Sequence, residues 1–311
     1  MRIVIFGNFS VDYCSEVHHA LSLEALGHHV VRLQETEVSS ERVLDESLKS
    51  SMLIWIHSHG FIVRGSMPMT EVLEKLKLCN IPTVAYHLDL YMGLQRWKDY
   101  ESSDYFKAQH FFTVDKLMAN WLNENTQTKG YYTPAGVLHE ECYDLRLPKK
   151  YDVIFVGSRG YHSEWPYRPQ LIDWLKQTYG DKFHHYGNDG EGVVRGTELN
   201  RLYGSTKVVV GDTLCPSFNY PYYFSDRLFE TIGRGGFLIY PYIRGIEEVF
   251  DTHKELVTYP YNDFETLKRL IDFFIENNEQ REQMRERAFE RVKINHTYLN
   301  RWETILKTIY G

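Results

Sequence analysis

The segment Ser225-Asp226-Arg227-Leu228-Phe229-Glu230-Thr231-Ile232-Gly233-Arg234-Gly235-Gly236 holds an arginine and a glutamate three residues apart. It predicts a helix over Ser225–Arg234 with Ser225 or Asp226 as its cap. Residues at this spacing share one face of a helix, so Arg227 would offer a fork for phosphate and Glu230 an acceptor for vicinal hydroxyls. The alternative is a plain salt bridge on a surface helix. The loop before this helix and the Gly-Gly pair after it favour a helix whose N-terminus points at a ligand.

A second group of polar residues follows the apolar run Asp152–Val156, in the loop Gly157-Ser158-Arg159-Gly160. Backbone N–H groups, the Ser158 hydroxyl and the Arg159 guanidinium would together hold a diphosphate. An ordinary glycine turn with a solvated arginine is the alternative. Arg168, near the start of the next helix, is a further cationic candidate. Neither G-x-G-x-x-G nor a Walker A sequence is present, which argues against a dinucleotide oxidoreductase or a P-loop enzyme.

Metal ligation is not predicted by the histidine pairs. His57 and His59 flank Ser58, and His184 adjoins His185, but adjacent or alternate residues of these short segments are poorly placed to share one ion. The sequence Gly211-Asp212-Thr213 lacks the second carboxylate of a D-x-D site for a metal–diphosphate complex. We therefore expect no structural metal, although a loosely held Mg²⁺ or Mn²⁺ stays open.

Alternating βα units must position these residues, because short apolar runs alternate with amphipathic stretches throughout the chain. The expected strands are Arg2–Phe6, His29–Leu33, Met52–Ile56, Thr83–Tyr86, Phe111–Val114, Asp152–Val156, Phe183–Tyr186, Lys207–Val210, Gly236–Tyr240 and Leu256–Tyr259. The expected helices are Glu16–Leu26, Glu41–Ser50, Thr70–Leu78, one from Asp115, Tyr167–Thr178, Thr197–Tyr203, Ser225–Arg234, Asp263–Glu276, Glu279–Val292 and one from about Thr297.

The pattern predicts an α/β protein with two Rossmann-like domains in tandem. We expect a first domain over residues 1–135, a linker over 136–150, a second domain over 151–295 and a terminal helix over 296–311 that packs back on the first domain. Open parallel sheets bind ligands at the carboxyl ends of their strands. The two sheets should therefore face each other across a cleft that holds the ligand.

The residues from Asp226 through Gly236 resemble the nucleotide-sugar segment of GT-B glycosyltransferases, particularly the spore-maturation-type and other group 1 glycosyltransferases. In those families a glutamate on this helix binds the donor ribose, a role the resemblance gives to Glu230, with Arg227 as its companion on the diphosphate. The chain also resembles, more loosely, the bacteriophage DNA β-glucosyltransferases. There a glycine–serine–arginine loop contacts phosphate, which matches Asp152–Arg159.

The resemblance implies an acceptor-activating base after a strand of the first domain, where Tyr86-His87-Leu88-Asp89 stands. We expect Asp89 to be this base, with His87, His57 and His59 as rivals. The alternative for Asp89 is a loop residue that caps the next helix. Many retaining members carry a second glutamate at the place of Tyr222, so an inverting mechanism is favoured. Gly157, Ser158, Arg159, Arg168, Asp212, Arg227 and Glu230 are the residues expected at the donor.

Composition sets limits on partners and compartment. The 311 residues include 35 Lys+Arg and 42 Asp+Glu, which gives a formal charge of -7. This balance does not indicate a surface that binds nucleic acid or membranes. No apolar run approaches a membrane span, and the run in Met1–Gly7 is too short for a signal-peptide core. The four cysteines form no C-x-x-C pair, so a reduced cytoplasm is expected.

The implied activity is transfer of a sugar from a nucleoside diphosphate, most simply a UDP-sugar, to an acceptor hydroxyl. A glycan, a small molecule or a hydroxymethylated base in DNA would serve as acceptor. Arg64, Arg96, Lys98 and Lys107 keep the DNA alternative open, since phosphate contacts need cations. An epimerase of nucleotide sugars and a non-catalytic sugar-nucleotide binding module are the alternative functions.

Overall fold

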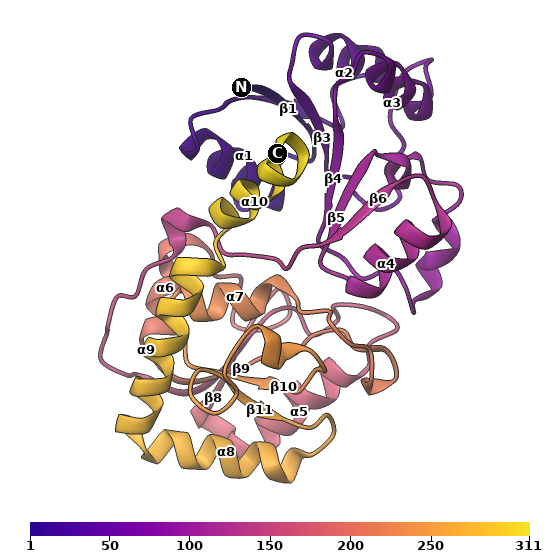
Figure 1. The fold of residues 1–311 in the computed structure, drawn as a ribbon. Helices are drawn as coiled ribbons and strands as arrows, with labels where there is room; N and C mark the ends of the chain where they lie inside the picture. Colours follow the sequence, from indigo (N-terminus) through magenta and orange to yellow (C-terminus); the bar gives the residue numbers. More distant parts are fainter. The chain divides into compact units, whose positions relative to one another are not determined.

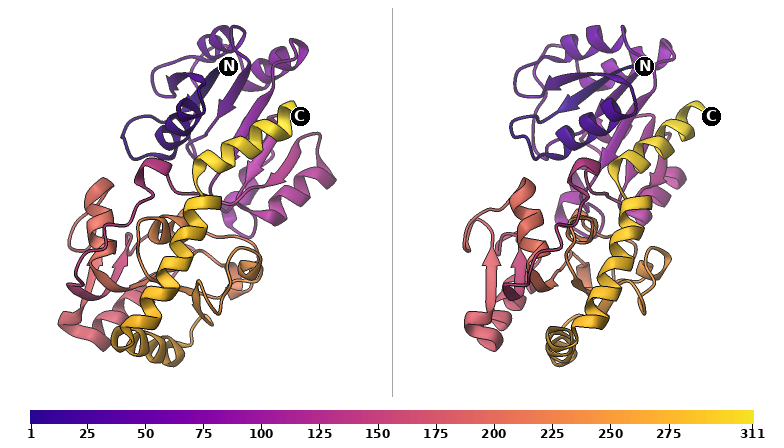
Figure 2. Two further views of the ribbon diagram at one scale, coloured as in Figure 1. Left: turned by 60° about the vertical axis from the view of Figure 1, so that its left-hand side comes forward. Right: turned by 90° about the vertical axis from the view of Figure 1, so that its left-hand side faces the viewer.

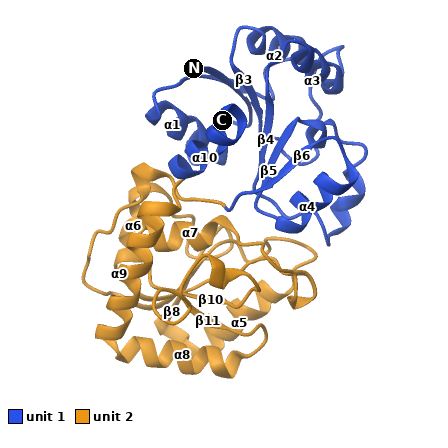
Figure 3. Cartoon of the chain, in the orientation of Figure 1, with its two compact units in different colours: residues 1–134, 298–311 blue, residues 135–297 orange.

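The computed structural model describes residues 1–311, and the chain forms two compact units (Figure 3). Unit 1 consists of residues 1–134 and 298–311, and unit 2 of residues 135–297. Each unit contains one sheet, and every strand pair in both sheets is parallel. The predicted α/β fold is confirmed.

The sheet of unit 1 has the order β2-β1-β3-β4-β5-β6. Its strands are β1 Arg2–Gly7, β2 His29–Gln34, β3 Met52–Trp55, β4 Thr83–His87, β5 His110–Thr113 and β6 Lys129–Tyr132. Its helices are α1 Ser15–Ala25, α2 Ser40–Ser47, α3 Met69–Leu78, α4 Lys116–Asn125 and α10 Tyr298–Tyr310. The central strands are buried on both faces, which explains their nearly continuous apolar sequences.

Alternate residues of β1 and β3 face two separate cores. Val4 and Leu53 belong to the core that α3 and α4 cover, whereas Ile5 and Ile54 belong to the core that α1 and α10 cover. This division follows from the two-residue period of a strand, which sends neighbouring side chains to opposite faces of the sheet. A helix layer therefore lies on each face of the sheet (Figure 1).

Helix α10 joins unit 1 although it follows unit 2 in the sequence (Figure 2). The Trp302 side chain is fully buried, and its indole N–H donates a hydrogen bond of 3.1 Å to Nδ1 of His19 on α1. Arg301 donates from Nε to the carbonyl of Pro134 at 2.9 Å, at the point where the chain leaves unit 1. The first contact attaches α10 to α1, and the second attaches it to the last residue of the 1–134 segment.

The sheet of unit 2 has the order β11-β10-β9-β7-β8. Its strands are β7 Tyr151–Val156, β8 Phe183–Tyr186, β9 Thr206–Val210, β10 Leu238–Pro241 and β11 Val257–Tyr259. Its helices are α5 Tyr167–Tyr179, α6 Gly196–Gly204, α7 Asp226–Gly233, α8 Phe264–Glu276 and α9 Asn278–Asn295. Figure 1 shows these elements in colours that run from pink through orange to yellow.

Strand β6 is the one strand that the sequence pattern did not predict. It has the sequence KGYY, with a glycine that weakens strand propensity and no β-branched residue. The structure explains Gly130, because a Cβ at this position would lie 2.3 Å from the carbonyl oxygen of Ala119 on α4. Close packing between helix and strand therefore outweighs local preference at this edge of the sheet.

Desolvation of three histidines in unit 1 predicts how the stability of the protein depends on pH. Burial lowers the pKa of His19 to about 3 and the pKa values of His57 and His87 to about 4. The folded state therefore keeps these imidazoles neutral, while the unfolded chain takes up protons near pH 6.5. Their contribution to stability is complete above that pH and is lost as the pH falls toward 4.

We expect the free energy of unfolding to be lower at pH 5 than at pH 7, by on the order of 1 kcal/mol for each buried histidine. Urea unfolding followed by tryptophan fluorescence measures this difference. His19→Gln should reduce the pH dependence, whereas the same change at the exposed His253 should not. Equal stability of the wild type at the two pH values would contradict the assignment.

Candidate functional site

Most of the donor residues predicted from the sequence lie where the direction of chain winding changes in unit 2. Strand β7 pairs with β8 on one side and with β9 on the other. The loops that leave β7 and β9 therefore run in opposite directions and leave a crevice between them, the usual ligand position in an open α/β sheet. Gly157 follows β7 and Asp212 follows β9, so both lie at this switch point.

Asp212 is the centre of this group of residues. Its side chain is fully buried, and both carboxylate oxygens accept hydrogen bonds from Nε of Arg168, at 2.9 and 3.0 Å. The indole N–H of Trp165 donates to Oδ2 at 3.0 Å. Arg168 is itself buried and donates from Nη1 to the carbonyl of Ser158 at 3.3 Å. A buried carboxylate is stable here because charge-assisted hydrogen bonds replace its hydration.

Arg227 supplies a second cation beside the same carboxylate. Its Nη1 lies 3.8 Å from Oδ1 of Asp212, and its side chain remains 20% exposed. Gly157 permits this position, since a Cβ there would lie 2.8 Å from Nη2 of Arg227, and its φ of +142° also favours glycine. The ring of Phe155 lies near both guanidinium groups, with its centroid 5.8 Å from Cζ of Arg168 and 6.0 Å from Cζ of Arg227.

Two guanidinium groups face the buried carboxylate of Asp212, and the exposed carboxylate of Asp226 also acts on Arg227. Arg168 donates a hydrogen bond from Nε to Asp212. Arg227 lies farther from the same carboxylate, at 3.8 Å, and its side chain is partly exposed. The fork of an arginine fits two oxygens of a phosphate. Ser225 at the N-cap of α7 gives no side-chain hydrogen bond to the helix, and its Oγ lies 3.4 Å from the hydroxyl oxygen of Tyr240. The carboxylate of Asp226 accepts the backbone N–H of Arg227 at 2.8 Å and so offsets part of the positive end of the helix.

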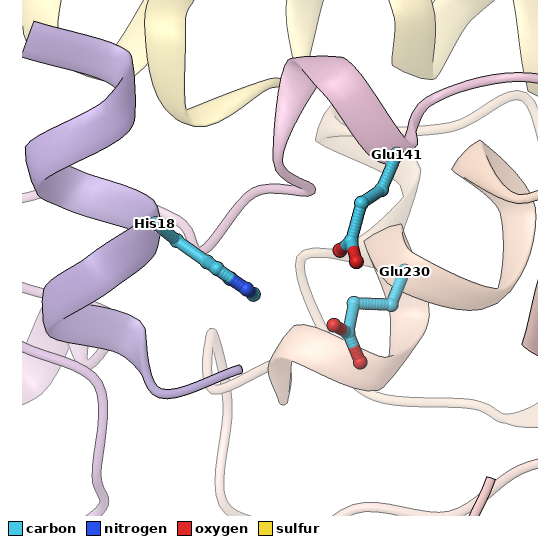
Figure 4. A group of neighbouring side chains, drawn as sticks. All are labelled: His18, Glu141 and Glu230. Carbon is cyan, nitrogen blue, oxygen red and sulfur yellow. The ribbon is translucent and has the colours of Figure 1, made fainter. Parts of the chain in front are cut away.

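Glu230 lies one turn further along α7, as its spacing from Arg227 predicts. Figure 4 shows its carboxylate near that of Glu141, and oxygens of the two groups lie within 4.8 Å of each other. Arg234 explains how two carboxylates tolerate this proximity, because its buried guanidinium pairs with Glu141 and lies 3.8 Å from Oε1 of Glu230. Glu230 is 27% exposed, so it remains accessible to a ligand's hydroxyl groups.

The Arg159 side chain lies outside this group. Its guanidinium pairs with the carboxylate of Asp173, with Nε 3.2 Å from Oδ1. The N–H groups of Arg159 and Gly160 donate to the carboxylate of Asp189 at 3.0 and 3.3 Å. These hydrogen bonds, chiefly that from Arg159, hold the pKa of Asp189 below its usual range. The loop after β7 therefore binds an anion, but that anion is a side chain of the same unit.

Asp89 and His87, the predicted catalytic residues, lie in unit 1 at the end of β4. The Asp89 side chain is 51% exposed, and its Oδ1 lies 4.0 Å from Nη2 of Arg96. His87 is buried among aromatic rings, the nearest being Tyr91 with centroids 5.0 Å apart. Burial lowers the pKa of His87 to about 4. Of the two, Asp89 is the side chain that a substrate hydroxyl can reach.

Several residues of the site were not predicted from the sequence. Trp165 donates a hydrogen bond to Asp212, and Arg234 pairs with Glu141 and lies beside Glu230. Asp189 accepts hydrogen bonds from the loop after β7. Only Arg234 carried a local signal, because it stands four residues after Glu230 on the same helix. The other partners come from distant parts of the chain, and nothing in their own segments distinguishes them from ordinary polar residues.

Comparison with known proteins gives the fold of the chain and the type of domain within it. Residues 168–307 match the family model described as glycosyl transferase-like. An alpha-glucosyltransferase solved with UDP-glucose and DNA containing an abasic site is similar over 100% of both chains, with a TM-score of 0.71 and 13% identity. No curated protein matches the sequence.

Two further solved structures have the same fold. A glycosyltransferase from Rickettsia africae ESF-5 covers 99% of this chain and 98% of its own, with a TM-score of 0.64 and 14% identity. HepE from Anabaena, solved with UDP-glucose, covers 99% of each chain, with a TM-score of 0.67 and 11% identity. The chain therefore has the GT-B fold, and a glycosyl transferase-like domain lies within it. None of its helices is both long and apolar enough to span a membrane.

The buried Asp212–Arg168 pair predicts a large difference between two substitutions. Asp212→Asn leaves the buried Arg168 without its counter-charge and should lower the free energy of unfolding by about 3 kcal/mol. Asp173→Asn removes the exposed partner of Arg159 and should cost less than about 1 kcal/mol. Urea unfolding of both variants measures the difference. Equal costs would show that Asp212 does not compensate a buried cation.

Proposed function

We propose that this protein is a glycosyltransferase that takes its sugar from a nucleoside diphosphate, with a UDP-sugar as donor. The observation that supports this proposal most strongly is the buried carboxylate of Asp212 between Arg168 and Arg227. These residues lie at the switch point of unit 2, where β7 and β9 are neighbours. This arrangement leaves the guanidinium of Arg227 partly exposed near the N-terminus of α7, and a diphosphate matches both features. Similar solved structures contain UDP or UDP-glucose, which supports uracil as the nucleobase of the proposed donor.

In this proposal Arg227 binds the diphosphate directly, and Glu230 accepts hydrogen bonds from the ribose hydroxyls. Arg168 and Asp212 position Arg227, while Gly157 leaves the space that its guanidinium occupies. These contacts belong to residues 151–295, which we propose as the donor side.

Two further residues complete the proposed donor site. Ser158 follows Gly157 and adds a hydroxyl beside the phosphates. The Arg159 side chain would have to leave Asp173 before it could reach a phosphate. The guanidinium groups supply the positive charge that Mg²⁺ or Mn²⁺ supplies at other diphosphate sites.

The proposed reaction is a direct displacement assisted by Asp89. The carboxylate removes the proton of the acceptor hydroxyl while that oxygen forms a bond to the anomeric carbon. The bond from this carbon to the β-phosphate oxygen breaks, and UDP leaves with the electron pair. Arg227 stabilises the charge that develops on UDP. Direct displacement inverts the anomeric configuration, and we place acceptor binding on residues 1–135, which contain Asp89.

The acceptor classes that this proposal allows are a glycan, a small molecule and a hydroxymethylated base in DNA. Several similar structures contain DNA, including one with an HMU base. In unit 1, Lys107 pairs with Asp104 at 2.9 Å, and Nε of Arg96 donates to the carbonyl of Leu90 at 2.7 Å. Two of the four cations considered for DNA phosphates therefore already have partners within the unit.

Replacement of Arg227 tests the donor site. Arg227→Ala should weaken UDP binding by roughly 10- to 100-fold, because it removes a charge-assisted contact to phosphate. Arg201→Ala is the matched control, since this exposed arginine of α6 pairs only with Glu198 three residues away. Isothermal titration calorimetry with UDP compares the two variants. Unchanged affinity in Arg227→Ala would remove the basis of the proposal.

Replacement of Asp89 separates chemistry from donor binding. Asp89→Asn should lower kcat for sugar transfer by roughly 10²- to 10⁴-fold and leave UDP affinity unchanged, because the amide cannot accept the proton. Asp45→Asn, on a similarly exposed aspartate of α2, should change neither quantity. NMR of the product gives its anomeric configuration. Retention of configuration, or full activity in Asp89→Asn, would rule out the proposed base, and an epimerised donor without transfer would identify an epimerase.

A further inference from the structure

Unit 1 contains a cavity of about 510 Å³ that is separate from the donor residues. Its walls come from the end of β3, from the loop of residues 57–69, from Tyr91 after β4 and from residues 99–104. The cavity lies at the carboxyl ends of β3 and β4, where a parallel sheet binds ligands. Its volume falls within the range of small-molecule sites.

Apolar and aromatic side chains form one part of the wall of this cavity, and polar atoms contribute about as much of its surface. The apolar and aromatic residues are Trp55, Phe61, Ile62, Val63, Met67, Met69 and Tyr91. Ile62 is 85% exposed, so a large aliphatic side chain meets water at the cavity. A ring placed against these residues would remove apolar surface from water on both partners. The wall therefore fits a molecule with a broad apolar or ring face.

The charge of the cavity opposes an anionic occupant. No lysine or arginine lines it, and its two carboxylates belong to Asp99 and Asp104. Asp104 is neutralised by Lys107, whereas Asp99 is exposed and forms no ion pair. Burial lowers the pKa of His57 to about 4, so this imidazole adds no positive charge at neutral pH. A phosphate would meet one free carboxylate and no free cation.

The cavity wall connects to the proposed base through Tyr91. This residue follows Asp89 by two positions, which limits their Cα separation to about 7 Å. Its hydroxyl lies 2.5 Å from Nδ1 of His59, and Cζ of Arg96 lies 4.5 Å from its ring centroid. The same Arg96 lies 4.0 Å from Asp89. Tyr91 therefore joins the cavity wall to the segment that carries Asp89, although this residue is only 4% exposed and its ring lies under Arg96.

We propose that this cavity binds the acceptor, and that the acceptor is an uncharged, hydroxyl-bearing ring compound, aromatic or saccharide. The apolar side chains bind the face of the ring, the hydroxyl of Ser103 is available to its polar edge, and Asp99 repels phosphorylated competitors. The hydroxyls of Ser66 and Ser102 already donate to Glu41 and to the carbonyl of Asp99. This inference rests on the proposed function, since Asp89 gives the bound hydroxyl its role. It selects small neutral acceptors over nucleic acid.

A matched pair of ligands tests the charge preference. 4-Nitrophenyl β-D-glucopyranoside and its 6-phosphate differ only in the phosphate, and 4-methylumbelliferone provides a neutral aromatic ring without sugar. Binding to the full chain is measured by calorimetry, with and without UDP. We expect at least one neutral ring to bind at least about tenfold more tightly than the 6-phosphate. Binding of neither neutral ring, or equal or tighter binding of the phosphate, would overturn the inference.

Two substitutions at equally exposed side chains test the location. Ile62→Asp places a carboxylate on the cavity wall and should weaken binding of the preferred neutral ring about tenfold. Leu78→Asp changes a residue of α3 that is 83% exposed and lies outside the cavity, and it should leave this binding unchanged. UDP affinity serves as the check that both variants are folded. Equal effects of the two substitutions would place the ring elsewhere.

Reversal of the local charge gives an independent readout. The wild type should prefer the neutral glucoside over its 6-phosphate. Asp99→Lys should reduce this preference, measured as the ratio of the two affinities, by at least about fivefold, because the phosphate then meets a cation. An unchanged ratio would contradict the role of Asp99.

The failure of this inference differs from the failure of the proposed function. Absence of UDP binding to the wild type would reject the donor site whatever the acceptor. UDP binding together with preferred transfer to a hydroxymethylcytosine duplex would reject the neutral acceptor alone.

Discussion

The buried carboxylate of Asp212 is the constraint on which the rest of the donor site depends. A charge without solvent contact is stable only when its partners are fixed, and here Arg168 and Trp165 supply them. The hydrogen bonds from Arg168 and Trp165 already compensate the charge of this carboxylate. The guanidinium of Arg227 is therefore not needed for that purpose, and it remains partly exposed. The site thus presents positive charge to a ligand without the cost of a second buried and unpaired ion.

The order of strands explains why these residues meet at all. Asp212 and Gly157 are more than fifty residues apart, but they end adjacent strands at the point where the winding of unit 2 reverses. Helix α7 then brings Arg227 and Glu230 to the same region through a spacing of three residues. Gly157 has no Cβ, which leaves room for the guanidinium of Arg227. Topology, helical periodicity and one glycine together place the group.

Much of this organisation was predictable, since apolar runs and helix-period patterns depend on local sequence. Ten of the eleven strands were expected, and the exception, β6, depends on close packing of Gly130 against α4. The Arg227–Glu230 spacing was predictable for the same local reason. The pairing of Arg159 with Asp173 and of Asp189 with the loop amides was not, because it joins segments whose proximity only the folded chain determines.

A crystal structure of the protein with UDP tests the central claim most directly. The account predicts that an oxygen of the diphosphate lies within hydrogen-bond distance of the Arg227 guanidinium and that the ribose hydroxyls donate to Glu230. It also predicts that Asp212 keeps its hydrogen bonds with Arg168. UDP bound with its diphosphate away from Arg227 and its ribose away from Glu230 would contradict the account.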